Sequence, residues 1–272
     1  MASFLHDGLA LAFDDVAPQG GGSGAVVLAH GFASNRDEGW RRTGWTDALQ
    51  ARGVRCVAID HRGHGESAKP YAAGAYAAEA MAGDLLALMD HLGLRSADLI
   101  GYSLGARIAL TVAQLAPERV ERLVLGGVGG RWLEPQDPAE VENHRSAMVE
   151  AMLTERPGDI EAPLLRSFRA FAEGQGEDRR ALAACAGAMG WSPPAAEDLA
   201  RLAMPVLVVT GARDRTAGDP QTLAEAFPDG RAAPVPGCDH FSAIPHPLTK
   251  AAVFDFFDGV LESDDDPFAR SF

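Results

Sequence analysis

The strongest constraint on the fold is an alternation along the chain between short, apolar, β-branched runs and longer segments of helical period. Each run is followed by a glycine or a polar turn before the next helical segment begins. This alternation is typical of βαβ units, which place parallel strands side by side in one sheet. We therefore predict an α/β fold built on a mainly parallel, doubly wound sheet. The expected strands are Ala25–Ala29, Val54–Ile59, Ala97–Gly101, Leu123–Gly126, Val206–Thr210 and Ala232–Val235.

Helices are expected on both faces of this sheet, because a parallel sheet is buried on both sides. Segments with apolar residues at helical spacing lie between and after the strands. The expected helices are Trp45–Arg52, Ala77–Leu92, Leu104–Leu115, Asp219–Phe227 and Pro247–Leu261.

The pattern changes between residues 131 and 200, where no β-branched run occurs and Ala, Glu and Arg are interrupted by Pro and Gly. We expect a small helical cap insertion here, with the core domain formed by residues 1–130 and 201–272. Because the insertion follows the fourth expected strand, it should lie above the carboxyl ends of the strands, where open α/β sheets bind ligands. The alternative is a surface elaboration that contacts no substrate.

Charge and composition exclude several classes of partner. The chain has 24 Lys and Arg against 38 Asp and Glu, a formal net charge of −14. This sign opposes phosphate binding, so neither nucleic acid nor an anionic membrane surface is expected as a partner. No segment has the roughly 18 consecutive apolar residues of a membrane span, and the first residues lack the features of a signal peptide, so we expect a cytoplasmic protein. Three widely spaced cysteines argue against a disulfide framework or a zinc site.

One short motif carries a candidate nucleophile. Gly101-Tyr102-Ser103-Leu104-Gly105 follows an expected strand and opens an expected helix. Glycines on both sides of Ser103 allow a sharp turn that projects its hydroxyl, and the helix N-terminus favours negative charge on a nearby oxygen. The motif alone is a modest signal, and a helix-capping serine is the alternative interpretation.

A base and an acid follow in the order expected for a serine nucleophile. His240 follows a late strand through a glycine-containing loop, and Asp214 closes the strand before it. A serine hydroxyl needs a base to accept its proton, and the base needs a third group to orient it. Asp239 adjoins His240, but neighbouring side chains on an extended loop diverge, so we predict Asp214 as the orienting acid.

Two backbone amides are candidates for stabilising an oxyanion. We assign the amide of Phe32, which follows His30-Gly31 at the end of a strand, and the amide of Leu104 at the helix N-terminus. His30 is expected to hold its loop by hydrogen bonds. The polar turn 60–67 (DHRGHGES) is likewise interpreted as structural, with no metal expected.

Together these motifs (HGF, DHRGHGES, GYSLG, GARD and GCDHF) resemble those of the α/β-hydrolase superfamily over about residues 24–128 and 205–261. The resemblance implies Ser103 as nucleophile, His240 as general base and Asp214 as acid, with the amides of Phe32 and Leu104 binding the oxyanion. It implies no cofactor. Haloalkane dehalogenases and epoxide hydrolases of this fold use an aspartate nucleophile, where this chain has serine.

The expected function is that of a serine carboxylesterase that cleaves a small or medium apolar acyl ester through an acyl-enzyme. Trp132, Phe168 and Trp191 of the insertion are expected to line the acyl side of the pocket. Thioester hydrolysis and carbon–carbon cleavage of ring-fission products stay open as alternatives within enzymes. A ligand-binding receptor on the same fold is the non-enzymatic alternative. The sequence does not indicate the oligomeric state.

Overall fold

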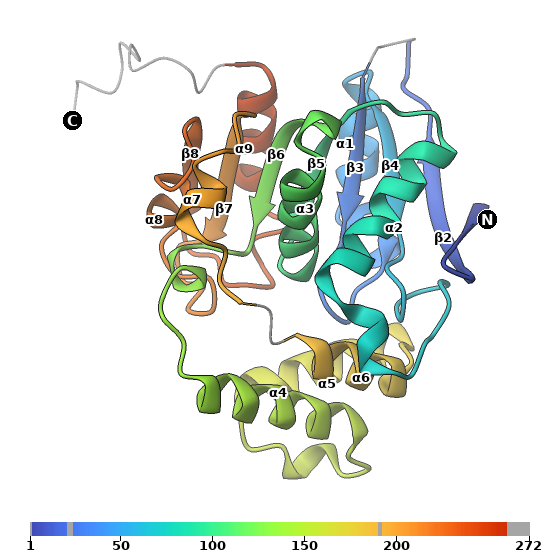
Figure 1. Cartoon of the computed structure of the whole chain (residues 1–272), viewed down its shortest axis with the longest axis vertical. Helices are drawn as coiled ribbons and strands as arrows, with labels where there is room; N and C mark the ends of the chain where they lie inside the picture. The colour runs from blue at the N-terminus through green and yellow to red at the C-terminus, as the bar shows by residue number, and fades with distance from the viewer. Residues whose placement is uncertain (1, 21–23, 190–191, 260–272) are drawn as a thin grey trace.

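A computed structural model describes residues 2–20, 24–189 and 192–259 of the chain. Its strands form one eight-stranded sheet in the order β1-β2-β4-β3-β5-β6-β7-β8 (Figure 1). From β4 through β3 to β8 neighbouring strands are parallel, whereas β1 with β2 and β2 with β4 are antiparallel. The predicted mainly parallel sheet is thus confirmed. The strands are β1 (Ala2–His6), β2 (Leu9–Val16), β3 (Ala25–Ala29), β4 (Arg55–Ile59), β5 (Ala97–Tyr102), β6 (Val120–Gly126), β7 (Val206–Gly211) and β8 (Gly230–Val235).

Both faces of the sheet are covered by helices, as the continuous apolar runs of the central strands require. In β3, Val26 and Leu28 pack in one core cluster, whereas Val27 and Ala29 pack in another. The first cluster includes residues of α1 and α9, and the second includes residues of α2, α3 and α8. These helices are α1 (Trp45–Ala51), α2 (Ala78–His91), α3 (Leu104–Leu115), α8 (Pro220–Ala224) and α9 (Pro247–Phe257).

The hairpin of β1 and β2 is an element that the sequence analysis did not assign. Asp7 and Gly8 form its turn with φ of 49° and 75°, and His6 pairs with Leu9 across it. Positive φ at both central residues is the geometry that hairpin turns of two residues favour, and Asp-Gly is a preferred pair for it. The hairpin adds an antiparallel edge to the parallel sheet.

The chain between β6 and β7 forms a group of helices, here called the helical insertion. Figure 1 shows its first three helices packed as a separate layer beyond the carboxyl ends of the parallel strands. Asp137 and Asp178 cap two of these helices by accepting hydrogen bonds from backbone amides. The α-helices of the insertion are α4 (Pro138–Leu153), α5 (Pro163–Gln175), α6 (Arg179–Ala188) and α7 (Ala196–Leu199).

One carboxylate ties the helical insertion to two loops of the core. Glu177, between α5 and α6, accepts hydrogen bonds from Asn35 Nδ2 at 2.9 Å and from the Gly65 amide at 2.8 Å. Its side chain is buried, and burial raises its pKa. Asn35 Oδ1 accepts in turn from the Glu38 amide at 2.9 Å. The insertion is therefore fixed to the loop that follows β3.

No helix in the described part of the chain combines the length and the apolar character that a membrane span requires.

Candidate active site

Ser103 lies at a strained turn between β5 and α3. Its backbone has φ of 55° and ψ of −111°, in a region that residues with a side chain rarely adopt. The flanking glycines are required by contact: a Cβ at Gly101 would lie 2.3 Å from the Gly105 oxygen, and one at Gly105 would lie 1.9 Å from the Ala29 oxygen. Such strain costs about 1–3 kcal/mol and occurs where surrounding packing enforces it. The turn presents the Ser103 hydroxyl to the imidazole of His240.

Ser103, His240 and Asp214 form a continuous chain of hydrogen bonds. The His240 Nε2 atom lies 3.0 Å from Ser103 Oγ, and His240 Nδ1 lies 2.7 Å from Asp214 Oδ2. With Asp214 ionised, the Nδ1 proton is donated to the carboxylate, which leaves Nε2 free to accept the serine proton. The structure thus brings together the three residues that the sequence analysis selected from three strand ends.

The environment of Asp214 favours its ionised form. Burial opposes ionisation, but hydrogen bonds from His240, Thr216 and the Ala217 amide outweigh this effect and lower the pKa of Asp214. Thr216 donates both its amide and its hydroxyl to Oδ1, at 2.9 and 2.6 Å. The second carboxylate oxygen therefore stays available to His240.

Asp239, the other candidate acid, forms its side-chain hydrogen bonds within its own turn. Its Oδ1 accepts hydrogen bonds from the Ser242 hydroxyl at 2.6 Å and from the amides of Ser242 and Phe241 at 2.9 and 3.1 Å. These bonds fold the side chain back onto its own turn. The turn is further fixed by Tyr102, whose hydroxyl donates to the His240 carbonyl at 2.6 Å.

The two amides assigned to the oxyanion lie on neighbouring segments. Ala29 pairs with Gly101 in the parallel ladder, so the turn that carries Phe32 and the turn that carries Ser103 leave the sheet side by side. The Leu104 amide occupies the first position of α3, where no carbonyl of the same helix can accept it. The Leu104 side chain itself is buried in the core.

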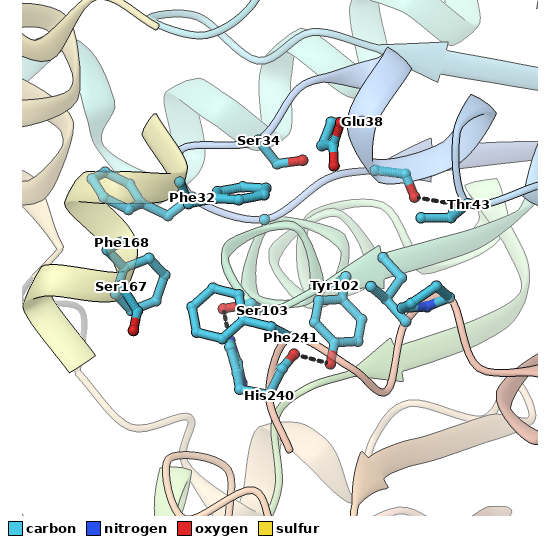
Figure 2. A pocket seen from close by; sticks show the side chains of 15 residues that line it. Phe32, Ser34, Glu38, Thr43, Tyr102, Ser103, Ser167, Phe168, His240 and Phe241 are labelled. Carbon is cyan, nitrogen blue, oxygen red and sulfur yellow. Dashed lines mark hydrogen bonds between the residues drawn. The ribbon is translucent and has the colours of Figure 1, made fainter. Parts of the chain in front are cut away.

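A cavity of about 510 Å³ opens beside Ser103 and His240. Aromatic side chains form much of its wall (Figure 2). Phe168 of α5 packs edge-on against Phe32, with 5.9 Å between ring centroids, and against Phe241, with 5.2 Å. The lining residues are Gly31, Phe32, Ser34, Glu38, Gly39, Thr43, Tyr102, Ser103, Ser167, Phe168, Phe171, His240, Phe241, Ile244 and Pro245.

Of the other two aromatic residues expected in the pocket, Trp132 is placed elsewhere. Trp132 does not line this cavity: it packs under the Arg107 guanidinium, 5.0 Å from ring centroid to Cζ, and borders a separate cavity. The short helix Gly130–Trp132 follows β6 after three residues and lies against α8, and the Trp132 side chain is buried in the hydrophobic core. Trp191 lies outside the described residues. The sequence analysis missed Tyr102 and Phe241, although they adjoin Ser103 and His240 along the chain.

The buried histidines near the site have structural contacts. His30 Nε2 accepts the His61 amide at 3.1 Å, and its Nδ1 lies 2.8 Å from the Gly31 oxygen. Burial lowers the pKa of His30 to about 4 and that of His64 to about 3, so both rings are neutral at pH 7. No cluster of three or more metal-ligating side chains is found among the described residues.

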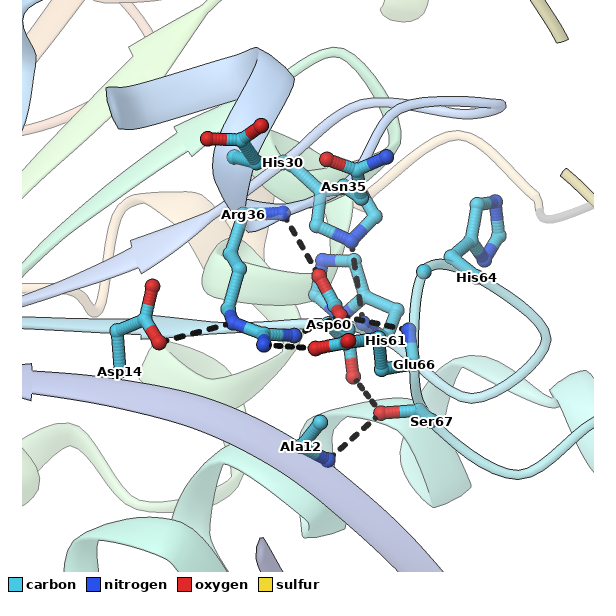
Figure 3. Close-up of polar contacts among 12 residues, drawn as sticks. Ala12, Asp14, His30, Asn35, Arg36, Asp60, His61, His64, Glu66 and Ser67 are labelled. Atoms are coloured by element: carbon cyan, nitrogen blue, oxygen red, sulfur yellow. Dashed lines mark hydrogen bonds and ion pairs between the residues drawn. The ribbon is translucent and has the colours of Figure 1, made fainter. Parts of the chain in front are cut away.

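Charged groups fix the turn 60–67 beneath the loop after β3 (Figure 3). Arg36 forms ion pairs with Asp60, Glu66 and Asp14. Asp60 also accepts the amides of Arg36 at 2.7 Å and Glu66 at 2.8 Å. A Cβ at Gly65, where φ is 51°, would collide with the Asp60 carboxylate at 2.2 Å. These contacts hold the loop of residues 32–36, which begins at the pocket-lining Phe32.

Comparison with known proteins identifies the family to which this fold belongs. The family described as having the alpha/beta hydrolase fold matches residues 24–183 of the chain. This match covers more than half of the sequence, and the sheet order and the serine turn accompany it. The protein belongs to the alpha/beta hydrolase fold family.

Individual relatives have different activities. The dihydrolipoyllysine-residue acetyltransferase component of the acetoin cleaving system of Pseudomonas putida is 30% identical over 230 residues, 81% of this chain and 60% of that protein. Epoxide hydrolase B of Mycobacterium tuberculosis is 38% identical over 99 residues, 36% of this chain and 27% of that protein. The chain thus spans 27% to 60% of these curated relatives. An esterase from Thermogutta terrifontis shares the fold, with a TM-score of 0.71, 24% identity and 96% coverage of both chains.

Proposed function

We propose that the protein is a serine hydrolase that cleaves carboxylic esters of small or medium apolar acyl groups. The observation that carries this proposal is the hydrogen-bonded chain Ser103–His240–Asp214, which ends at an aromatic cavity of about 510 Å³. A serine, a neutral imidazole and an ionised carboxylate in this order form the arrangement that acyl transfer requires. A relative named as an epoxide hydrolase shares sequence with the chain, but the nucleophile position here is serine.

The reaction has two balanced steps. His240 accepts the Ser103 proton at Nε2 while Oγ attacks the ester carbonyl, and the imidazolium then gives this proton to the departing alcohol. Water next attacks the acyl-enzyme, loses a proton to His240, and the acid leaves as Ser103 recovers its proton. The amides of Phe32 and Leu104 stabilise the negative oxygen formed in both steps. Asp214 holds the imidazole in the reactive tautomer.

The helical insertion is assigned the role of a cap in this proposal. Its helix α5 contributes Ser167, Phe168 and Phe171 to the cavity wall. An acyl chain that enters between these rings loses contact with water, which favours apolar over polar acyl groups. The division into a core of residues 1–130 and 201–272 and a cap of residues 131–200 belongs to this proposal.

Labelling at the nucleophile tests the proposal. A fluorophosphonate probe should label the protein, and S103A should abolish both labelling and p-nitrophenyl ester turnover. S167A is the matched control, because Ser167 lines the same cavity without contacting His240 through a hydrogen bond, and it should keep the label. Undiminished turnover in S103A would refute the assignment.

A panel of substrates separates the remaining alternatives. Among matched oxygen esters, thioesters and carbon–carbon ring-fission substrates, we expect an oxygen ester to have the highest kcat/KM. A receptor on the same fold would release at most one equivalent of p-nitrophenol per protein. A preference for the ring-fission substrate would contradict the proposed ester specificity.

A further inference from the structure

The carboxylate of Glu38 belongs to a pocket wall that carries no other fixed charge. Among the described residues that line the cavity, Glu38 is the only Asp, Glu, Lys or Arg. It belongs to the short helix η1 (Asp37–Arg41), which follows the loop that leaves β3. Figure 2 shows Glu38 and Ser34 across the cavity from Ser103 and His240. Phe168 lies towards one end of this view and Thr43 towards the other.

Glu38 is only partly neutralised by the protein. Its Oε2 accepts a hydrogen bond from Arg42 Nη1 at 3.2 Å, and Oε1 accepts none from the described residues. Arg42 is shared, because its Nε atom also lies 3.0 Å from Asp37 Oδ2. Its side chain is 64% exposed and does not line the cavity. An ion pair at such an exposed position is weak, so Arg42 compensates the carboxylate only in part, and Oε1 is left without a hydrogen bond from the described residues.

The neighbours on the wall do not satisfy that oxygen. Thr43 donates its hydroxyl to the Gly39 oxygen at 2.7 Å, and the Ser34 hydroxyl is directed to the Asn35 oxygen at 3.5 Å. Ile244 and Phe32 add apolar surface to the same cavity. When a ligand fills the space and displaces water, the carboxylate loses solvation unless the ligand supplies a compensating charge.

We propose that Glu38 selects ester substrates that carry a positive charge in the part of the molecule that lies towards Ser34 and Thr43. This inference rests on the ester hydrolysis proposed above and names a substrate class for the same site. A cation gains attraction from Glu38, a neutral group of the same shape leaves the carboxylate uncompensated, and an anion is repelled. The net charge of −14 also attracts cations, but this field acts on the whole surface rather than on one wall.

Isosteric pairs of esters test the inference. Butyrylcholine and 3,3-dimethylbutyl butyrate have the same shape. The quaternary nitrogen of the first is replaced by a quaternary carbon in the second, so that the pair differs by one positive charge in the alcohol half. The p-nitrophenyl esters of 4-(trimethylammonio)butanoate and 5,5-dimethylhexanoate place the same difference in the acyl half. In the wild type we expect the cationic member of at least one pair to have the higher kcat/KM, and E38Q should lower this cationic-to-neutral ratio about tenfold.

D37N is the matched control. Asp37 precedes Glu38 on the same helix, pairs with the same Arg42 and does not line the cavity, so its ratio should stay within about twofold of the wild type. Each ratio is measured within one variant, which cancels differences in the amount of active protein. An equal ratio in all three proteins, or an equal fall in E38Q and D37N, would overturn the role of Glu38 while leaving ester hydrolysis intact. If the protein hydrolyses none of the four esters and no other p-nitrophenyl ester, the proposed function itself is refuted.

Discussion

At the scale of single residues, the contacts of His240 distinguish two acids that lie close to it along the chain or in space. Asp239 is its sequence neighbour, but its carboxylate is occupied by the Ser242 hydroxyl and by local amides. Asp214 comes from another strand end and reaches Nδ1 at 2.7 Å. Asp214, the residue more distant along the chain, therefore orients the imidazole and stabilises its positive charge.

Substitution of both acids measures this difference. D214N keeps the shape of the side chain but removes the charge and the tautomer preference, so it should lower kcat by about 10³- to 10⁴-fold, the scale known for the equivalent change in a serine protease. D239N should cost about tenfold or less, through weaker long-range stabilisation of the imidazolium. Steady-state kinetics of both variants on one ester provide the comparison. A crippled D239N beside a nearly normal D214N would show that the assigned acid is wrong.

The residues that could be chosen from sequence are those whose position follows from topology. Ser103, Asp214 and His240 each follow an apolar strand, and parallel strands bring such positions to one edge of the sheet. Trp132 also follows a strand, yet its indole packs against Arg107 instead of the cavity. Residue type predicts that an aromatic ring is buried, but the face to which it turns depends on packing between elements that the sequence does not reveal.

At the scale of elements, the parallel core was easier to predict than its edge and its insertion. Long apolar runs such as AVVLA are typical of strands buried on both faces, and β3 spans the expected residues. The hairpin of β1 and β2 carries a weaker alternation, and its Asp7-Gly8 turn was the signal that could have identified it. In the insertion, helices were expected as a group, but their bounds depend on capping by Asp137 and Asp178.

Helix α5 provides a prediction at this scale. F168A should remove a ring from the cavity wall and shift the ratio of kcat/KM for a long against a short acyl ester about tenfold towards the long one, because the enlarged space admits the chain. L165A on the same helix is the control: Leu165 is buried in the core and does not line the cavity. It should reduce thermal stability and leave the chain-length ratio unchanged. Identical ratios in F168A and the wild type would exclude α5 from substrate selection.

At the scale of the whole molecule, neutral buried histidines link stability to pH. Burial lowers the pKa of His30 to about 4 and of His64 to about 3, and it keeps the pKa of His61 well below the ordinary value. In the unfolded chain these rings take up protons near pH 6.5. The unfolded state therefore binds more protons below this pH, and the free energy of unfolding falls as the pH drops from about 6.5 towards 4.

Urea unfolding at several pH values between 7.5 and 5.5 measures this linkage. Each buried histidine contributes a slope of up to about 1.4 kcal/mol per pH unit below the unfolded pKa. H64N removes one titrating group, so its slope should be smaller by up to that amount, whereas H144N, at an exposed position of α4, should keep the slope of the wild type. The interpretation fails if H64N and the wild type lose stability in parallel over this range.

The carboxylate of Glu177 makes the docking of the helical insertion depend on contacts that are distant along the chain. Its partners Asn35 and Gly65 precede it by 142 and 112 residues, so both bonds close very long loops. Closing such loops costs chain entropy that is recovered only when both ends are already in place. Docking of α5 at this junction therefore requires both core loops, which precede it along the chain, to be in place. Asp214 and His240 follow strands that come after the insertion along the chain, so the complete cavity joins core loops that precede α5 to strand ends that follow it.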